Sequence, residues 1–249
     1  MAADDRFKDI DFNDFRALAK DKDLSKYEKI GFPDSYREGY EGVIFDDICN
    51  KLSNLQKEGS RVLDIGPGCS DLPVMLIDQC REKKQSLVLV DNSEMLDLLP
   101  SDSFINKVNA LYPCCPDIFS DYAGKLDAIL CYSVLHYILI DTAFFRFLDL
   151  SLSLLAPGGQ MLIGDIPNIS KRKRFFSSDT GIKYHQRYMD TNELPEMSYC
   201  EISHDQIDDS VVFALVQRAR LAGFDAYIVP QNSTLPMSNR REDILIVRS

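Results

Sequence analysis

The sequence predicts an α/β domain built around a doubly wound, mostly parallel sheet. From residue 61 onward, short apolar runs alternate with segments of helical periodicity, a pattern typical of parallel strands joined by helices. One run, SLVLV at residues 86–90, is apolar almost throughout, which indicates a strand covered on both faces. The chain has 249 residues, of which 45% are hydrophobic and 27% charged, and this is enough for one domain with a sizeable core.

The predicted helices and strands follow one another along the chain. Residues 5–30 are charged, with scattered apolar positions, and predict one or two short N-terminal helices. Apolar residues at every third or fourth position predict helices over residues 44–55, 72–80, 93–99, 142–155 and 210–222. For the short helix at 93–99, Asp91 and Ser93 are equally suitable capping residues. Strands are predicted over residues 61–65, 86–90, 104–108, 126–131 and 160–166.

The C-terminal part departs from this alternation. The Pro-Gly-Gly sequence at 157–159 stops the preceding helix. Residues 166–210 show little periodicity, which predicts a long irregular insert that serves as a lid or a substrate-binding element. After Gly223, the runs FDAYIVP and EDILIVR follow without an intervening helix and predict an antiparallel pair. The single domain is thus expected to comprise an N-terminal helical cap (1–58), a core (59–167), the insert (168–209) and a C-terminal helix with two strands (210–249).

The net charge and the cysteine content argue against several classes of protein. Lys and Arg number 28 against 39 Asp and Glu, so the net charge of −11 argues against binding to nucleic acid or to anionic membranes. No apolar run reaches the roughly 18–20 residues that a membrane span needs, and the acidic N-terminus does not resemble a signal peptide. The seven cysteines lack paired spacing, which argues against a disulfide scaffold and a zinc site. We therefore expect a soluble, reduced, cytoplasmic protein.

The most informative segment is VLDIGPGCSDL at residues 62–72, a strand followed by a glycine turn and a helix. Gly66 and Gly68 allow a tight turn and a close approach of a ligand to the backbone. A dinucleotide fingerprint would require Gly or Ala at position 71, which is Asp71 here. It would also place the negative charges of Asp64 and Asp71 beside an anionic pyrophosphate, which is unfavourable. A ligand that lacks phosphate and carries positive groups suits this loop better.

The segment resembles the cofactor-binding motif of class I S-adenosylmethionine (SAM)-dependent methyltransferases, in which an acid precedes glycines at alternate positions. Asp64, Gly66 and Gly68 match that motif, and Ser70 stands where a third glycine is usual. The resemblance covers about residues 62–167. It implies a Rossmann-like fold, SAM as the cofactor and methyl transfer as the activity.

Asp91 lies directly after the predicted strand at 86–90. A carboxylate can accept two donors at once, so we expect Asp91 to bind both ribose hydroxyls. Asn92 and Met95 would flank the adenosine. The alternative interpretation of Asp91 is a helix cap.

The resemblance also implies cofactor contacts outside these two segments. An Asn-Ala pair stands where the family often has an acid-Ala pair against the adenine, and the turn after the fourth strand would line the cleft beneath the methionine. An N-terminal arginine would close over the cofactor carboxylate. The residues so implied are Arg37, Asn109, Ala110, Cys131, Tyr132, Ser133 and His136.

Candidate catalytic groups come mainly from histidines in the insert. His185 lies between two tyrosines in KYHQRY and would form an aromatic, basic wall around an acceptor, or else it is a surface residue. His204 with Asp205 forms either a base with a carboxylate nearby or a capping turn. Asp165, at the end of the fifth strand, and His136, after the fourth, are further candidates because ligands of such sheets bind beyond the carboxyl ends of the strands. The alternative for His136 is a structural role beside the cofactor.

The basic run KRKR at 171–174 suits a phosphate or carboxylate on the acceptor, or else it is a solvated surface. A metal-dependent enzyme would need clustered carboxylates. Asp165 and Asn168 are near each other without an identifiable third ligand, so no obligatory metal is expected.

Together these features predict a SAM-dependent methyltransferase that acts on a small molecule. The specific candidate is a sugar hydroxyl or amine of surface-polysaccharide biosynthesis. One alternative is a catalytically silent SAM-binding subunit or scaffold, and another is a nicotinamide-dependent oxidoreductase, which Asp64 and Asp71 disfavour. The expected partner is the small-molecule acceptor, without nucleic acid or a membrane span, and homo-oligomerisation stays open.

Overall fold

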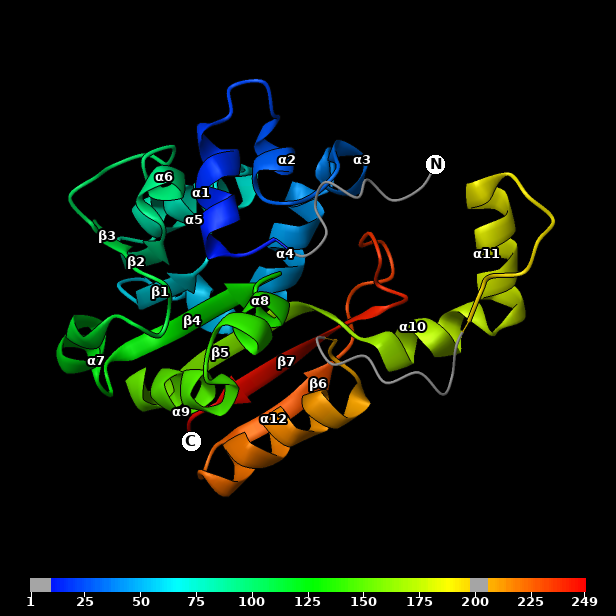
Figure 1. Cartoon of the computed structure of the whole chain (residues 1–249). Helices are drawn as coiled ribbons and strands as arrows, with labels where there is room; N and C mark the ends of the chain where they lie inside the picture. Colours follow the sequence, from blue (N-terminus) through cyan, green and yellow to red (C-terminus); the bar gives the residue numbers. More distant parts are fainter. Residues whose placement is uncertain (1–9, 198–205) are drawn as a thin grey trace.

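A computed structural model describes residues 10–197 and 206–249, and these form one seven-stranded sheet with helices on both faces (Figure 1). The strand order is β3-β2-β1-β4-β5-β7-β6. Neighbouring strands are parallel except where β7 pairs antiparallel with β5 and β6. The strands are β1 (Arg61–Ile65), β2 (Ser86–Asp91), β3 (Ile105–Asn109), β4 (Leu126–Tyr132), β5 (Leu155–Pro167), β6 (Asp225–Val229) and β7 (Arg241–Val247). The predicted mixed sheet with an antiparallel C-terminal strand is confirmed.

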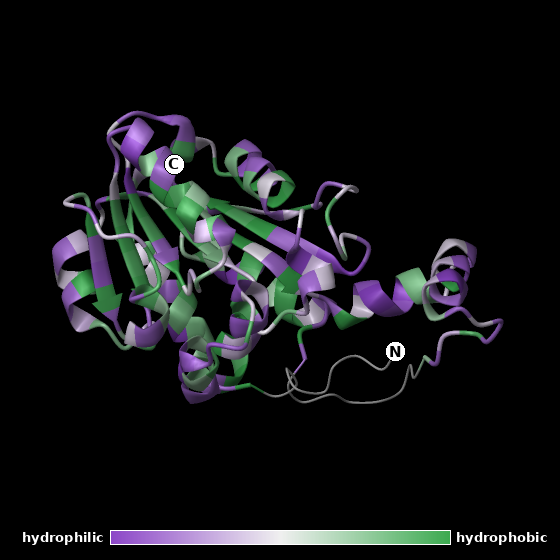
Figure 2. Cartoon of the chain, turned by 90° about the horizontal axis from the view of Figure 1, so that it is seen from above, coloured by the Kyte–Doolittle hydropathy of each residue, from purple (hydrophilic) through white to green (hydrophobic). Residues whose placement is uncertain are grey.

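Alternate residues of the central strands pack on opposite faces, because successive side chains of a strand point to opposite sides. Leu63, Ile65 and Ile129 belong to one buried cluster, and Val62 and Leu130 belong to the other. The first cluster is covered by α7 (Pro116–Tyr122), α8 (Leu135–Asp141), α9 (Phe144–Leu154) and α12 (Asp209–Leu221). The second is covered by α4 (Glu41–Lys51), η2 (Ser53–Gln56), α5 (Asp71–Glu82) and α6 (Ser93–Leu96). Figure 2 shows the strands as a hydrophobic layer inside a more polar exterior.

Three short helices precede the sheet and lie near the carboxyl ends of its first strands. They are α1 (Phe12–Lys20), α2 (Lys26–Lys29) and α3 (Asp34–Arg37), and α1 packs against α6. Asp11 caps α1 and Ser25 caps α2, each through a reciprocal capping box. The ammonium of Lys20 pairs with Glu94 of α6 at 3.0 Å. Within the described residues, no helix is both long and apolar enough to cross a bilayer.

The insert is helical, which the sequence interpretation did not anticipate. The structure places α10 (Ile169–Phe176) and α11 (Asp179–Met189) in the stretch predicted to be irregular. Asn168 and Ser178 cap these helices by accepting backbone N–H groups. Their aromatic residues pack on one another, as in the stack of Tyr184 on Tyr188 with ring centres 6.0 Å apart. They do not belong to the hydrophobic core of the sheet. Both helices are polar on average, so few apolar residues mark them in the sequence.

Other differences from the predicted elements are local. A separate helix, α8, directly follows β4, and α9 ends at Leu154, so that β5 runs through the Pro-Gly-Gly sequence. The residue that caps α6 is Asn92, whose side chain accepts the N–H of Met95, so neither Asp91 nor Ser93 is the cap. Helix and strand boundaries of this kind depend on which neighbour satisfies each backbone group.

Candidate functional site

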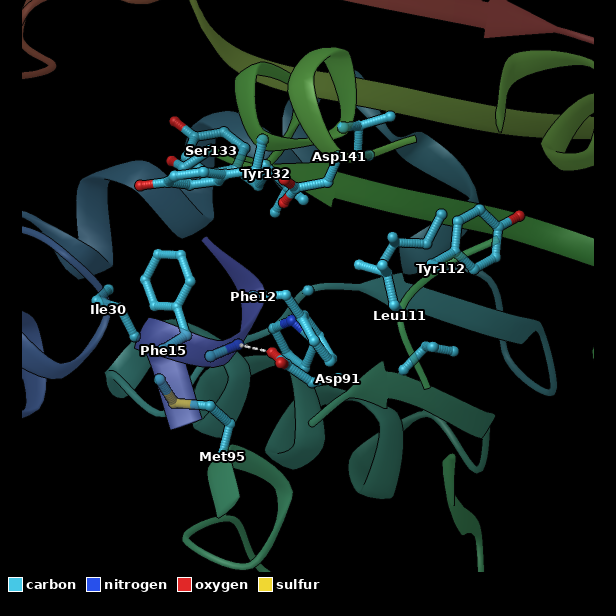
Figure 3. Close-up of a pocket in the computed structure, with 18 of the residues that line it drawn as sticks. Phe12, Phe15, Ile30, Asp91, Met95, Leu111, Tyr112, Tyr132, Ser133 and Asp141 are labelled. Carbon is cyan, nitrogen blue, oxygen red and sulfur yellow. Dashed lines mark hydrogen bonds between the residues drawn. The ribbon is translucent and has the colours of Figure 1, made fainter. Parts of the chain in front are cut away.

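A cleft opens at the carboxyl ends of β1, β2 and β4, where open α/β sheets bind ligands. Its volume is about 910 Å³, including space open to solvent. Figure 3 shows Asp91 and Met95 on one side of the cleft and Tyr132 and Ser133 on the other. Phe12 and Phe15 of α1 also line it, so the N-terminal helices form part of its wall.

The loop after β1 approaches the cleft with its backbone. Gly66 and Gly68 have φ of +68° and +65°, a left-handed conformation that favours glycine. A Cβ at Gly66 would lie 2.7 Å from Cγ2 of Val134, and a Cβ at Gly68 would lie 2.6 Å from Cγ2 of Ile30. The loop is therefore closely packed from both sides, and only glycine fits these two positions.

Replacing Gly66 with alanine should destabilise the protein, because the left-handed backbone costs a non-glycine residue roughly 1–2 kcal/mol and the new methyl group clashes as well. Gly59→Ala is a matched control, since Gly59 has a φ of +74° with no heavy atom within 4 Å of its would-be Cβ. Urea denaturation should give a larger loss of unfolding free energy for Gly66→Ala than for Gly59→Ala. Equal losses would mean that Val134 yields without cost.

Asp91 connects this loop to β2. One carboxylate oxygen accepts the N–H of Gly68 at 3.0 Å and the other accepts the N–H of Asn92 at 2.7 Å. An ionised carboxylate has about four acceptor positions, so two remain for donors in the cleft. Burial raises the pKa of Asp91 to about 6, although these two hydrogen bonds oppose the rise.

A second acid lies beneath the loop. Asp64 is only 4% exposed, and no hydrogen bond to its side chain is found among the described residues. Burial, followed by the charge of Asp91, raises its pKa to about 8. Two carboxyl groups that resist ionisation therefore lie together, and a nearby positive charge would relieve both.

The amino end of α5 is satisfied by protein groups. The hydroxyl of Ser70 accepts the N–H of Leu72 at 3.4 Å and donates to the Glu41 carboxylate at 3.3 Å. Glu41 is buried, and burial raises its pKa. Asp71 pairs with Lys26 of α2 at 2.5 Å. A pyrophosphate of a dinucleotide would need this helix end, which already carries two carboxylates.

A buried polar cluster lies across the cleft from Asp91. The guanidinium of Arg37, 3% exposed, donates to Ser133 Oγ at 2.5 Å and lies 3.5 Å from Asp165 Oδ2. Ser133 Oγ in turn donates to Asp165 at 2.5 Å. Ser133 directly follows β4 and Asp165 lies near the end of the adjacent strand β5, with φ of +62° and +56°. Left-handed non-glycine residues of this kind concentrate at functional sites.

The structure brings many of the predicted cofactor residues together. Those that line the cleft are Arg37, Gly66, Gly68, Ser70, Asp91, Met95, Ala110, Tyr132 and Ser133. Others lie behind or beside it. Asp64 and Cys131 are buried beneath the strand ends, and Asn92 caps α6. Asn109 is exposed, where its side chain accepts the N–H of Ser93, and His136 lines a neighbouring cavity.

The predicted catalytic residues are not gathered at the cleft. His185 lies on α11, with its ring 6.3 Å from that of Phe176, and α11 projects away from the sheet (Figure 1). His204 and Asp205 lie outside the described residues. Within the described part, no three His, Cys, Asp or Glu side chains group as a metal site would require.

Several lining residues escaped sequence reasoning. Phe12 and Phe15 face the cleft from a helix whose apolar residues are sparse, and Tyr137 faces it from the unpredicted α8. Glu41, which accepts a hydrogen bond from Ser70 beside the cleft, belongs to no recognisable sequence motif. The sequence did contain one indication of the α1 wall: Phe12 and Phe15 are three positions apart, which places both on one face of a helix.

The residues that line the cleft fit a cationic nucleoside. It combines apolar and aromatic walls with the Asp91 carboxylate, a close backbone turn and no lysine or histidine in its described lining. The amide nitrogen of Asn92 is buried without a partner among the described groups.

No family model matches the chain, and no curated protein matches it at a significant level. Solved structures do match. A SAM-dependent methyltransferase from Aquifex aeolicus is 14% identical, with a TM-score of 0.55, over 91% of this chain and all of its own. The plantazolicin methyltransferase BpumL in complex with a monoazolic desmethylPZN analogue and SAH is 15% identical, with a TM-score of 0.58, over 94% of this chain and 95% of its own.

A third similar structure is a SAM-dependent methyltransferase, itself described as putative, from Methanococcus maripaludis. It is 14% identical, with a TM-score of 0.53, over 96% of this chain and 94% of its own. At these identities the likeness concerns the fold. The chain has the fold of class I SAM-dependent methyltransferases.

Proposed function

We propose that this protein is a SAM-dependent methyltransferase acting on a small molecule. The observation that carries the proposal is the cleft itself, in which a glycine turn and Asp91 face the ligand while Glu41 and Asp71 occupy the helix end that a pyrophosphate would need. This arrangement favours a ligand without phosphate and with positive charge. A sugar hydroxyl or amine is the first acceptor to test.

SAM supplies a methyl group that its sulfonium has already activated. The task of the protein is then to position the two reactants. The free acceptor positions of Asp91 suit the two ribose hydroxyls. Phe12 and Phe15 cover the apolar part of the ligand and exclude water. The Arg37–Ser133–Asp165 cluster holds the ends of β4 and β5 in place, on the side opposite the ribose.

Titration calorimetry with SAM, S-adenosylhomocysteine and NAD tests this proposal. We expect binding of the first two and none of NAD. Asp91→Asn should weaken SAM binding by roughly 1–3 kcal/mol, the range for hydrogen bonds to charged groups, because the amide accepts at one atom only. Asp97→Asn, at an exposed position just after α6, is the matched control and should bind like the parent.

Binding of NAD alone would replace the proposal with an oxidoreductase. Unchanged SAM affinity in Asp91→Asn would show that the ribose lies elsewhere.

A catalytically silent SAM-binding subunit is the second candidate, and the lack of lysine and histidine in the described lining of the cleft favours it. Methyl transfer over a panel of sugars and amines separates the two. An enzyme releases S-adenosylhomocysteine with some member of the panel, whereas a silent subunit binds SAM without consuming it.

A further inference from the structure

A second cavity lies beside the cleft. It has about 750 Å³, including space open to solvent, and it is bounded by the start of α8, the end of β5, α10 and the segment before β7. His136, Arg172, Arg240 and Arg241 contribute its ionisable side chains. Three arginines thus meet in a chain whose net charge is −11.

Two of these guanidinium groups are electrostatically uncompensated. Arg241 pairs with Asp165 at 3.3 Å. Arg172 and Arg240, in contrast, form no ion pair with any described carboxylate. Their guanidinium carbons lie 5.7 and 5.9 Å from the centre of the Phe176 ring, so both side chains contact the same aromatic residue.

His136 completes the cavity with a neutral polar group. Burial, followed by the charge of Arg241, lowers its pKa to about 3, so the imidazole is neutral near pH 7. Its Nδ1 is buried and has no hydrogen-bond partner in the described part of the chain. Its ring lies 3.9 Å from that of Tyr137, which lines the cleft, so His136 stands at the wall between the two spaces.

The charged side chains of the basic run at 171–174 have different partners. The ammonium of Lys171 donates to the first main-chain carbonyl of β7 at 2.6 Å, and Arg174 pairs with Asp209. Arg172 lines the cavity. The run is therefore neither a uniform solvated surface nor a single anion clamp.

We propose that this second cavity binds the anionic group, a carboxylate or a phosphate, of the methyl acceptor. The guanidinium groups of Arg172 and Arg240 offer paired N–H donors that match the oxygens of such an anion. His136 adds a neutral polar side chain to the wall of the same cavity. The inference rests on the proposed function, because the cavity adjoins the cleft and would direct the rest of the acceptor toward it.

The test is a titration of inorganic phosphate, and separately of acetate, into the S-adenosylhomocysteine-saturated protein at constant ionic strength. We expect the parent to bind at least one of these anions, and the preferred anion then distinguishes a phosphate from a carboxylate. The double variant Arg172→Gln, Arg240→Gln should bind it at least about tenfold more weakly, since each charged hydrogen bond contributes more than a tenfold effect. Arg146→Gln, at an exposed position on α9, is the matched control and should bind the anion like the parent.

Equal anion binding by the double variant and the parent would overturn the inference, and so would a parent that binds neither anion. A separate titration with SAM keeps the two proposals apart. The double variant should bind SAM like the parent, because neither arginine lines the cleft. If the parent fails to bind SAM, the proposed function fails, and repeating the anion titration without S-adenosylhomocysteine still tests the cavity.

Discussion

Replacing Asp64 with asparagine should stabilise the ligand-free protein, and the gain should grow as the pH rises from about 4 to 8. The pKa of Asp64 is about 8 in the folded chain, against an ordinary value of 3.8 for an aspartate. Between these values the unfolded chain has released the proton while the folded chain retains it, so unfolding is increasingly favoured as the pH rises. The stability associated with this group is complete below pH 4 and is lost as the pH rises through 8.

Urea denaturation at pH 5, 6, 7 and 8 measures this effect. The unfolding free energy of Asp64→Asn minus that of the parent should increase by at most about 1.4 kcal/mol per pH unit, the limit for one proton. Asp46→Asn, an exposed carboxyl on α4, should give a small difference that does not change with pH. A flat difference for Asp64→Asn would show that this carboxyl ionises as easily in the folded chain as in the unfolded one.

This prediction bears on function. A buried, unpartnered carboxyl destabilises the ligand-free fold, and residues kept at such a cost tend to serve a ligand. Asp64 and Asp91 lie together beneath a turn shaped by two glycines. Their ionised forms are stabilised by positive charge, so a sulfonium or ammonium group nearby would offset the cost.

Replacing Arg37 with alanine should lower the unfolding free energy by roughly 3–5 kcal/mol, as is usual when one partner of a buried ion pair is removed. The loss arises because Asp165 keeps Arg241 but loses a second cation, and because Glu41 loses its nearest one. The guanidinium also packs over the Phe32 ring at 4.5 Å. Denaturant titration at pH 7 checks this.

Arg146→Ala, at an exposed position, should stay within about 0.5 kcal/mol of the parent. A loss below about 1 kcal/mol for Arg37→Ala would contradict a structural role. In that case the main role of Arg37 would be the one implied by family resemblance, contact with the cofactor carboxylate.

The central elements were predictable because their signals are local. β1 was predicted at its observed bounds, since its apolar run ends at a Gly-Pro turn that no strand continues through. The insert was mispredicted for the opposite reason. The helices α10 and α11 are polar on average and bury almost no side chain, so few apolar residues mark them in the sequence.

By itself the sequence determined the strands of the sheet, the antiparallel ending and the glycine turn with Asp91 at the next strand, because each depends on residues close together in the chain. Only the tertiary structure decided that Glu41 occupies the amino end of α5 and that Arg37 is buried against Asp165. It alone also brought His136, Arg172 and Arg240 to one cavity. The partners and burial of a charged side chain depend on segments far apart in the sequence, and no local pattern records which of them meet.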